Sequence, residues 1–231
     1  AIAAGLFSLR KLDGAAITVS IAGVCLSFIL SCFAFGTIAL GGEQATIDVA
    51  RWIGSGSFQA HWTLRFDTLT AVMLIVVTGV SSCVHIYSVG YMHNDKSIAR
   101  FMAYLSLFTF AMLMLVTADN LVQLFFGWEG VGVASYLLIG FWHHKETAHT
   151  AAMKAFVVNR VGDFGFVLGI LAIFALTGSV SFDSIFESVS SYQTATISIF
   201  GLQLPALELV SVLLFIGAMG KSAQFLLHTW L

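Results

Sequence analysis

The chain has 231 residues, of which 58% are hydrophobic and only 10% are charged, and its mean hydropathy is +0.94. Soluble globular domains carry about a quarter charged residues, so this composition excludes a soluble fold and indicates an integral membrane protein. The formal net charge is −2 and no basic cluster is present, which excludes a surface for nucleic acid.

The hydrophobic runs predict an all-α, polytopic bundle of transmembrane helices in a single membrane domain over residues 1–231. After a short apolar start, six runs are long enough to cross a hydrocarbon core about 30 Å thick. They cover approximately residues 17–40, 66–92, 101–117, 120–142, 157–176 and 207–231. Because the chain has no initiator Met and stops within apolar sequence, we expect a fragment of a longer protein.

The segments between the runs are polar. Residues 41–65 and 177–206 are predicted loops, and Asp67 and Asp119 are predicted helix N-caps. Only two basic residues, Arg51 and Arg65, fall in the first of these loops. The other segments gather six basic residues on the opposite side of the membrane: Arg10, Lys11, Lys96, Arg100, Lys145 and Lys154. The positive-inside rule therefore places residues 10–13, 93–100 and 143–154 on the cytoplasmic or matrix side.

One carboxylate, Glu129, lies in the middle of the fourth run. An isolated ionised carboxylate at the bilayer centre costs about 2.5–3.5 kcal/mol on insertion scales, so such a residue usually faces a partner or water on an ion path. The small residues Gly127, Gly130, Gly132 and Ala134 would let other helices or water approach it closely. A protonated, purely structural glutamate is the alternative.

A second intramembrane charge, Lys221, lies near the middle of the sixth run. Gly217, Lys221, Gln224 and His228 fall at i, i+4, i+7 and i+11, so they line one face of this helix, and this face could hold a wire of water. A lysine that snorkels to the interface is the alternative.

A proton relay between Glu129 and Lys221 is the interpretation that the two charges favour, because they fall at comparable depth on helices of opposite direction. Two opposite charges about 6 Å apart at an effective dielectric of about 20 interact by about 2.8 kcal/mol. Such a coupling influences whether the lysine keeps its proton without fixing it.

Other polar residues within the runs have structural alternatives. Arg160 and Asp163 fall in the first two turns of the fifth run, where they could form an interfacial ion pair. His85 fits a packing histidine, although His85 and His228 could instead ligate a membrane haem. The sequence has no Gly-x-Gly-x-x-Gly fingerprint and no cysteine cluster, so we expect no nicotinamide cofactor, redox centre or metal in this chain.

Four stretches carry a resemblance to a known family. They are HIYSVGYMHND (85–95), NLVQLFFGWEGVGVASYLLIGFW (120–142), AAMKAFVVNRVGDFGF (151–166) and GAMGKSAQFLLHTWL (217–231). In these stretches the chain resembles the antiporter-like subunit five, or L, of respiratory complex I, the NADH:quinone oxidoreductase.

The resemblance implies a function for the whole assembly. In that family the matching Glu and Lys are the paired proton-translocating charges, here Glu129 and Lys221, and the matching Arg and Asp, here Arg160 and Asp163, modulate the channel. It also implies two inverted five-helix repeats, of which this chain would hold most of the first. An enzyme role as a subunit of the translocase would follow.

The resemblance further implies partners and a location. The partners would be other membrane subunits and the lipid bilayer, in a bacterial cytoplasmic or mitochondrial inner membrane. NAD, FMN, iron–sulfur clusters and quinone would then bind elsewhere in the complex. A related Mrp-type Na⁺/H⁺ antiporter subunit remains the alternative function.

Overall fold

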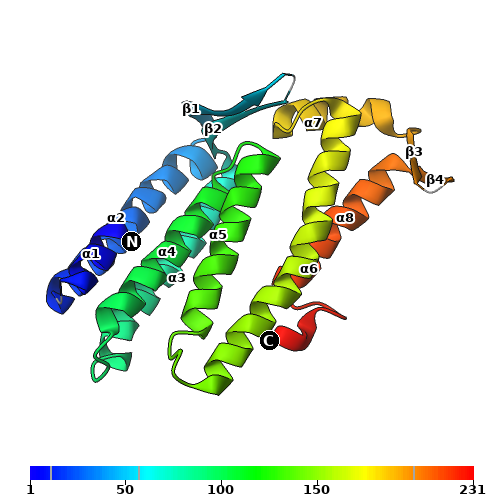
Figure 1. Ribbon diagram of the computed structural model, residues 1–231. Helices are drawn as coiled ribbons and strands as arrows, with labels where there is room; N and C mark the ends of the chain where they lie inside the picture. The colour runs from blue at the N-terminus through cyan, green and yellow to red at the C-terminus, as the bar shows by residue number, and fades with distance from the viewer. Residues whose placement is uncertain (11, 57, 200) are drawn as a thin grey trace. The chain divides into compact units, whose positions relative to one another are not determined.

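The hydrophobic runs fold as long helices in the computed structural model, which describes residues 1–10, 12–56, 58–199 and 201–231. Lys11, one of the six basic residues above, lies outside the described residues. The helices are α1 (Ile2–Leu9), α2 (Asp13–Ala34), α3 (Thr68–Tyr91), α4 (Ile98–Val116), α5 (Leu121–Ile139), α6 (Glu146–Thr177), α7 (Phe182–Ser188) and α8 (Ala206–Lys221). The π-helix η1 (Phe35–Leu40) and the 3₁₀ helices η2 (Val189–Tyr192) and η3 (His228–Trp230) complete the helical elements (Figure 1).

Among the described residues, five segments are long and apolar enough to cross a membrane, and each overlaps one of the first five predicted runs: Asp13–Leu40, Thr68–Tyr91, Ile98–Val116, Leu121–Ile139 and Glu146–Thr177. Away from its two ends, a helix pairs its backbone N–H and C=O groups within one segment, as a lipid environment requires. The predicted start of the fifth run at residue 157 is wrong, because α6 already begins at Glu146. The predicted sixth run to residue 231 is also wrong, because α8 ends at Lys221.

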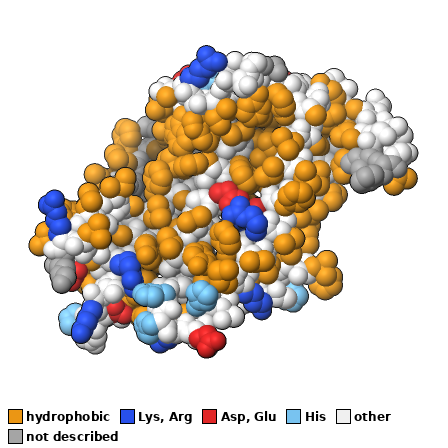
Figure 2. Space-filling model, in the orientation of Figure 1, with side chains coloured by type: hydrophobic (Ala, Val, Ile, Leu, Met, Phe, Trp, Pro, Cys, Tyr) orange, Lys and Arg blue, Asp and Glu red, His pale blue; other side chains and the backbone are white. Residues whose placement is uncertain are grey.

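The surfaces of these helices suit a bilayer. Large side chains such as Leu26, Val80 and Phe164 are 57%, 61% and 66% exposed, and hydrophobic side chains cover most of the face seen in Figure 2. Hydroxyl groups inside the helices turn back to the carbonyl four residues earlier, as Thr78 does to Leu74 and Ser82 to Thr78. This bond satisfies a polar group that no water would reach.

Two segments predicted as loops contain β-hairpins. Strand β1 (Ala45–Ser55) pairs with β2 (Phe58–Phe66), and β3 (Thr196–Ile199) pairs antiparallel with β4 (Leu202–Pro205). In β2 apolar residues alternate with polar ones from Phe58 to Phe66, which is the period of a strand with one buried face. The fold class is therefore helical, as predicted. The two small β-hairpins were not predicted.

The contacts divide the chain into two compact units, where the sequence predicts a single domain. The first unit contains Ala1–Ile47, Leu64–Ala118 and Phe126–Phe141, and the second contains Asp48–Thr63, Asp119–Phe125 and Trp142–Leu231. In the first unit α2, α3 and α4 lie side by side, and in the second α6 packs along α8 (Figure 1). The second unit also has an apolar core at one end of α6, around Phe166, Ile170 and Ile173.

Candidate functional site

Lys221 is the last residue of α8. Its ammonium Nζ lies 3.7 Å from Oδ2 of Asp163 on α6, and the two side chains are 18% and 4% exposed. The distance is that of an ion pair with a loose geometry, and both groups are largely removed from solvent. At this distance the opposite charges of the two groups attract each other.

Glycines bring the two backbones together at this pair. A Cβ added to Gly162 would lie 3.1 Å from the Cα of Gly220, and one added to Gly217 would lie 2.7 Å from the Cβ of Phe166. Gly162 directly precedes Asp163, and Gly220 directly precedes Lys221. The close crossing of α6 and α8 therefore sets the ion pair, as small residues do where membrane helices meet.

The neighbours of Asp163 on α6 have separate roles. Arg160 and Asp163 lie near the middle of α6, so their predicted place in its first two turns is wrong. The guanidinium of Arg160 stacks over the ring of Phe156 at 5.0 Å. The Oδ1 atom of Asn159 is buried and accepts no hydrogen bond from the described residues, and a buried acceptor of this kind is a natural place for a bound water.

Gln224 and His228 do not share a helical face with Lys221. The α-helix stops at Lys221, Gln224 lies in the turn that follows, and His228 opens η3; both side chains are exposed. The predicted water wire along Gly217, Lys221, Gln224 and His228 is therefore wrong, because the chain leaves the helical path after Lys221.

Glu129 lies on α5 and is half-buried. Its flanking glycines pack against α4, since a Cβ added to Gly127 would come 2.6 Å from the backbone N of Leu115, and one added to Gly130 would come 3.0 Å from the Cβ of Ala111. The predicted close helix approach around Glu129 is confirmed for α4. Glu129 belongs to the first unit and Lys221 to the second, so the pairing of the two stays a prediction.

His85 is fully buried between α3 and α4. Its Nδ1 lies 2.8 Å from the carbonyl oxygen of Ser81, and its Nε2 lies 3.3 Å from Oγ of Ser106. Both ring nitrogens are engaged within the first unit, which favours the packing role, because an axial haem ligand needs one nitrogen for the iron.

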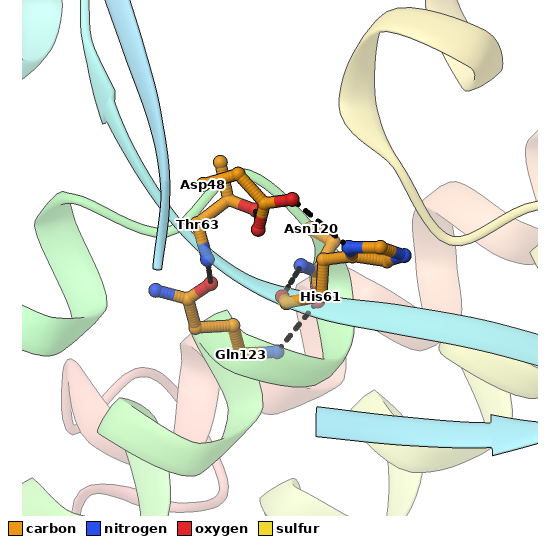
Figure 3. Close-up of polar contacts among 5 residues, drawn as sticks. All are labelled: Asp48, His61, Thr63, Asn120 and Gln123. Atoms are coloured by element: carbon orange, nitrogen blue, oxygen red, sulfur yellow. Dashed lines mark hydrogen bonds and ion pairs between the residues drawn. The ribbon is translucent and has the colours of Figure 1, made fainter. Parts of the chain in front are cut away.

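A polar cluster joins the β-hairpin to the start of α5, and the sequence did not predict it. Figure 3 shows Asn120 and Gln123 pointing toward β2: Nδ2 of Asn120 donates to the carbonyl of His61 at 2.8 Å, and the backbone N–H of Thr63 donates to Oε1 of Gln123 at 3.1 Å. Asp48 of β1 approaches both His61 and Thr63 at 3.3 Å.

The same cluster corrects the predicted cap of α5. Oδ1 of Asn120 accepts the backbone N–H of Gln123 at 2.9 Å, which is the N-cap bond, so Asn120 and not Asp119 caps this helix. Asp119 instead accepts a bond from the backbone N–H of Phe182 through its own carbonyl. The amide of Asn120 thus serves both the helix and the hairpin, a double use that only the fold reveals.

Comparison with known proteins places this site in a family. Residues 118–231 match the family model described as NADH:quinone oxidoreductase/Mrp antiporter, TM, and residues 52–102 match the one described as NADH-ubiquinone oxidoreductase (complex I), chain 5 N-terminus. The chain belongs to this complex I chain 5 family. Its first family match includes Glu129, Asp163 and Lys221.

Two curated relatives illustrate the match to the chain. The NADH-quinone oxidoreductase subunit L of Rhodobacter capsulatus is 56% identical over 223 residues, covering 94% of the chain and 31% of that relative. The NADH-ubiquinone oxidoreductase chain 5 of Arabidopsis thaliana is 54% identical over 221 residues, covering 95% of the chain and 32% of that relative. The chain thus spans about a third of the length of these relatives and matches them as a multi-pass membrane protein.

Solved structures share the fold at low identity. The Mrp complex from Dietzia sp. DQ12-45-1b aligns with a TM-score of 0.80 at 22% identity, over 99% of the chain and 23% of the solved chain. The membrane-bound sulfane sulfur reductase, an archaeal respiratory membrane complex, aligns with a TM-score of 0.76 at 17% identity, over 99% of the chain and 44% of the solved chain. The antiporter-like fold is therefore shown.

Proposed function

We propose that the chain is the N-terminal part of the proton-translocating, antiporter-like membrane subunit of NADH:quinone oxidoreductase. The names of its relatives support the assembly, and the buried ion pair of Lys221 and Asp163 supports the proton-transfer role. The membrane would be the bacterial cytoplasmic or the mitochondrial inner membrane. Other membrane subunits and the bilayer are its partners, while NADH, FMN, iron–sulfur clusters and quinone bind elsewhere in the complex.

In this proposal Lys221 is the group that holds the moving proton. As an ammonium it is stabilised by Asp163 at 3.7 Å. When the proton leaves, Asp163 remains as a nearly buried carboxylate without that counter-charge, which is unfavourable and draws a proton back. Lys221 therefore reloads after each transfer, and the buried acceptor of Asn159 offers a water position on the same helix.

Glu129 is the proposed second group of the relay. Glu129 is a half-buried carboxylate within an apolar helix, and ionisable residues in such helices mark proton and ion paths. A change at Glu129 would then alter the proton affinity of Lys221, and electron transfer elsewhere in the complex would supply the driving force.

The test is NADH-driven proton uptake into inverted membrane vesicles, normalised to assembled complex. In the full-length protein, Lys221→Ala and Glu129→Gln should each lower uptake, and the isosteric Gln should leave assembly intact. Parental uptake by an assembled Lys221→Ala complex would contradict the proton-holding role. Parental uptake with Glu129→Gln would make that glutamate structural.

An Mrp-type Na⁺/H⁺ antiporter is the second candidate, because the fold matches a solved Mrp complex. The two functions differ in the ion that they require. Replacing Na⁺ with choline in the vesicle assay should leave NADH-driven uptake unchanged if the chain serves the oxidoreductase. Proton movement that depends on a Na⁺ gradient would favour the antiporter.

A further inference from the structure

The segment that follows Lys221 has a strained backbone. Ala223 has φ 48° and Leu226 has φ 77°, and both lie in the left-handed region that residues with a Cβ rarely adopt. Strained backbone of this kind persists where surrounding contacts hold it in place. The turn after α8 therefore requires a contact that stabilises its conformation.

Trp230 supplies a contact that closes this turn. Its indole Nε1–H donates a hydrogen bond of 2.9 Å to the carbonyl oxygen of Gly220. The same oxygen accepts a longer bond of 3.4 Å from the backbone N–H of Ala223. The last carbonyls of a helix have no partner within the helix, so the indole acts as a cap on the end of α8. The element that carries Trp230, η3, packs on α6.

The capped carbonyl belongs to the residue that directly precedes the lysine of the ion pair. A Cβ added to Gly220 would lie 3.3 Å from the Cα of Gly162, so the two backbones are in close contact there. Gly220 and Gly162 directly precede the charged residues Lys221 and Asp163, whose side chains are 3.7 Å apart. A shift of the last turn of α8 would change that distance.

We propose that Trp230 is a positioning residue, whose indole N–H holds the last turn of α8 through Gly220 and thereby sets Lys221 against Asp163. The inference rests on the proposed function of Lys221. It differs from a packing role, because it assigns the effect to one N–H group and not to the bulk of the ring.

The first experiment compares Trp230→Phe with Trp142→Phe in the full-length subunit within the assembled complex. Phenylalanine keeps an aromatic ring and removes the donor. One hydrogen bond shifts a local equilibrium by about two- to tenfold, so proton uptake per assembled complex should fall by about that factor in Trp230→Phe. Trp142, whose ring contacts Lys145, is the control and should keep parental uptake.

Two tryptophan analogues at position 230 separate the donor from the shape, including where Trp230→Phe does not assemble. The benzothiophene analogue has sulfur in place of the N–H within a bicycle of nearly the same shape, and 5-fluorotryptophan retains the N–H. The fluorinated ring should restore parental uptake, and the benzothiophene ring should show the two- to tenfold loss. Equal uptake with both analogues would overturn the proposal, since packing would then explain the residue.

Lys221→Ala in the same membranes distinguishes this inference from the proposed function. Normal uptake by Lys221→Ala would overturn the proposed function and the inference with it. Reduced uptake by Lys221→Ala together with parental uptake by the benzothiophene analogue would overturn the inference alone.

Discussion

Asp163 and Lys221 show how strongly a single buried charge depends on its partner. Removing one partner of a buried pair leaves the other charge in apolar surroundings, which costs about 3–5 kcal/mol when burial is complete. Lys221 keeps 18% exposure, so part of that cost is relieved by solvent. The remaining cost explains why a nearly isosteric change at Asp163 should affect both stability and function.

Asp163→Asn is therefore expected to lower NADH-driven proton uptake several-fold. It should also lower the free energy of unfolding of the subunit by about 1–3 kcal/mol. The matched control is Glu187→Gln on α7, a change of the same kind at an exposed carboxylate, which should change neither quantity. Equal behaviour of the two variants in a thermal unfolding series and in the vesicle assay would contradict the role of the ion pair.

Asp67 is the N-cap of α3, as the sequence predicts. Its Oδ1 accepts the backbone N–H of Thr70 at 2.8 Å, and its Oδ2 pairs with Nε of Arg65 at 3.1 Å. Burial raises the pKa of this carboxyl. The hydrogen bonds from Thr70 and Arg65 and the positive charge of Arg65 lower the pKa by more than burial raises it, so the pKa lies below its ordinary value.

The lowered pKa predicts a pH-dependent contribution to stability. The carboxylate stabilises the folded chain above the unfolded-state pKa of about 3.9, and this contribution is lost as the pH falls through the folded-state pKa. Asp67→Asn keeps a capping side chain and removes the charge, so it should destabilise by about 0.3–1 kcal/mol at pH 7. Thermal unfolding in detergent should show this gap closing below about pH 4; a gap that stays constant with pH would point to a cause other than the charge.

At the scale of elements, the crossing of α6 and α8 depends on glycine. Gly162→Ala adds a Cβ that lies 3.1 Å from both the Cα of Gly220 and the carbonyl oxygen of Ile216. Backbone atoms cannot yield as a flexible side chain does, so the helices must separate. We expect a loss of about 1–3 kcal/mol in stability and reduced proton uptake.

Gly23→Ala on α2 is the control for this prediction, because a Cβ there has nothing within 4 Å. Alanine within a helix is then neutral or stabilising by up to about 1 kcal/mol. Thermal unfolding of both variants decides the matter: equal melting temperatures would show that the crossing has room for a methyl group.

The sequence was sufficient for most of the long helices and insufficient for the elements between them. A membrane span requires an uninterrupted apolar run, which composition alone reveals. The hairpin of β1 and β2 was missed, although Phe58, Ala60 and Trp62 alternate with polar residues, because a polar average indicated a loop. The end of α8 was missed because no helix breaker stands next to Lys221, and the left-handed Ala223 leaves no signature in the sequence.

For the site, the sequence identified the charged residues but not their contacts. Glu129 and Lys221 stand out because any charge within an apolar run is conspicuous. The contact of Lys221 with Asp163 depends on which helices cross. Gly162 and Gly220 indicate a close approach without naming the partner helix. Trp230 lies near the end of the stretch 217–231. The sequence did not show that it caps α8, because its hydrogen bond to Gly220 forms only when the intervening turn brings the two residues together.

At the scale of the whole molecule, each compact unit contributes one of the two proposed relay charges. Glu129 lies in the first unit and Lys221 in the second, where Asp163 accompanies it. A relay of this kind requires that the lysine release its proton in each cycle. A structural ion pair requires only a permanent positive charge.

Lys221→Arg distinguishes these two requirements most directly. Arginine keeps the positive charge, but the pKa of its guanidinium is so high that it does not give up its proton in a protein. The measurement is NADH-driven proton uptake into inverted vesicles, normalised to assembled full-length complex. The relay predicts that Lys221→Arg assembles and loses most of its proton uptake, as Lys221→Ala does. Parental uptake by Lys221→Arg would contradict the relay and show that a fixed positive charge beside Asp163 is sufficient.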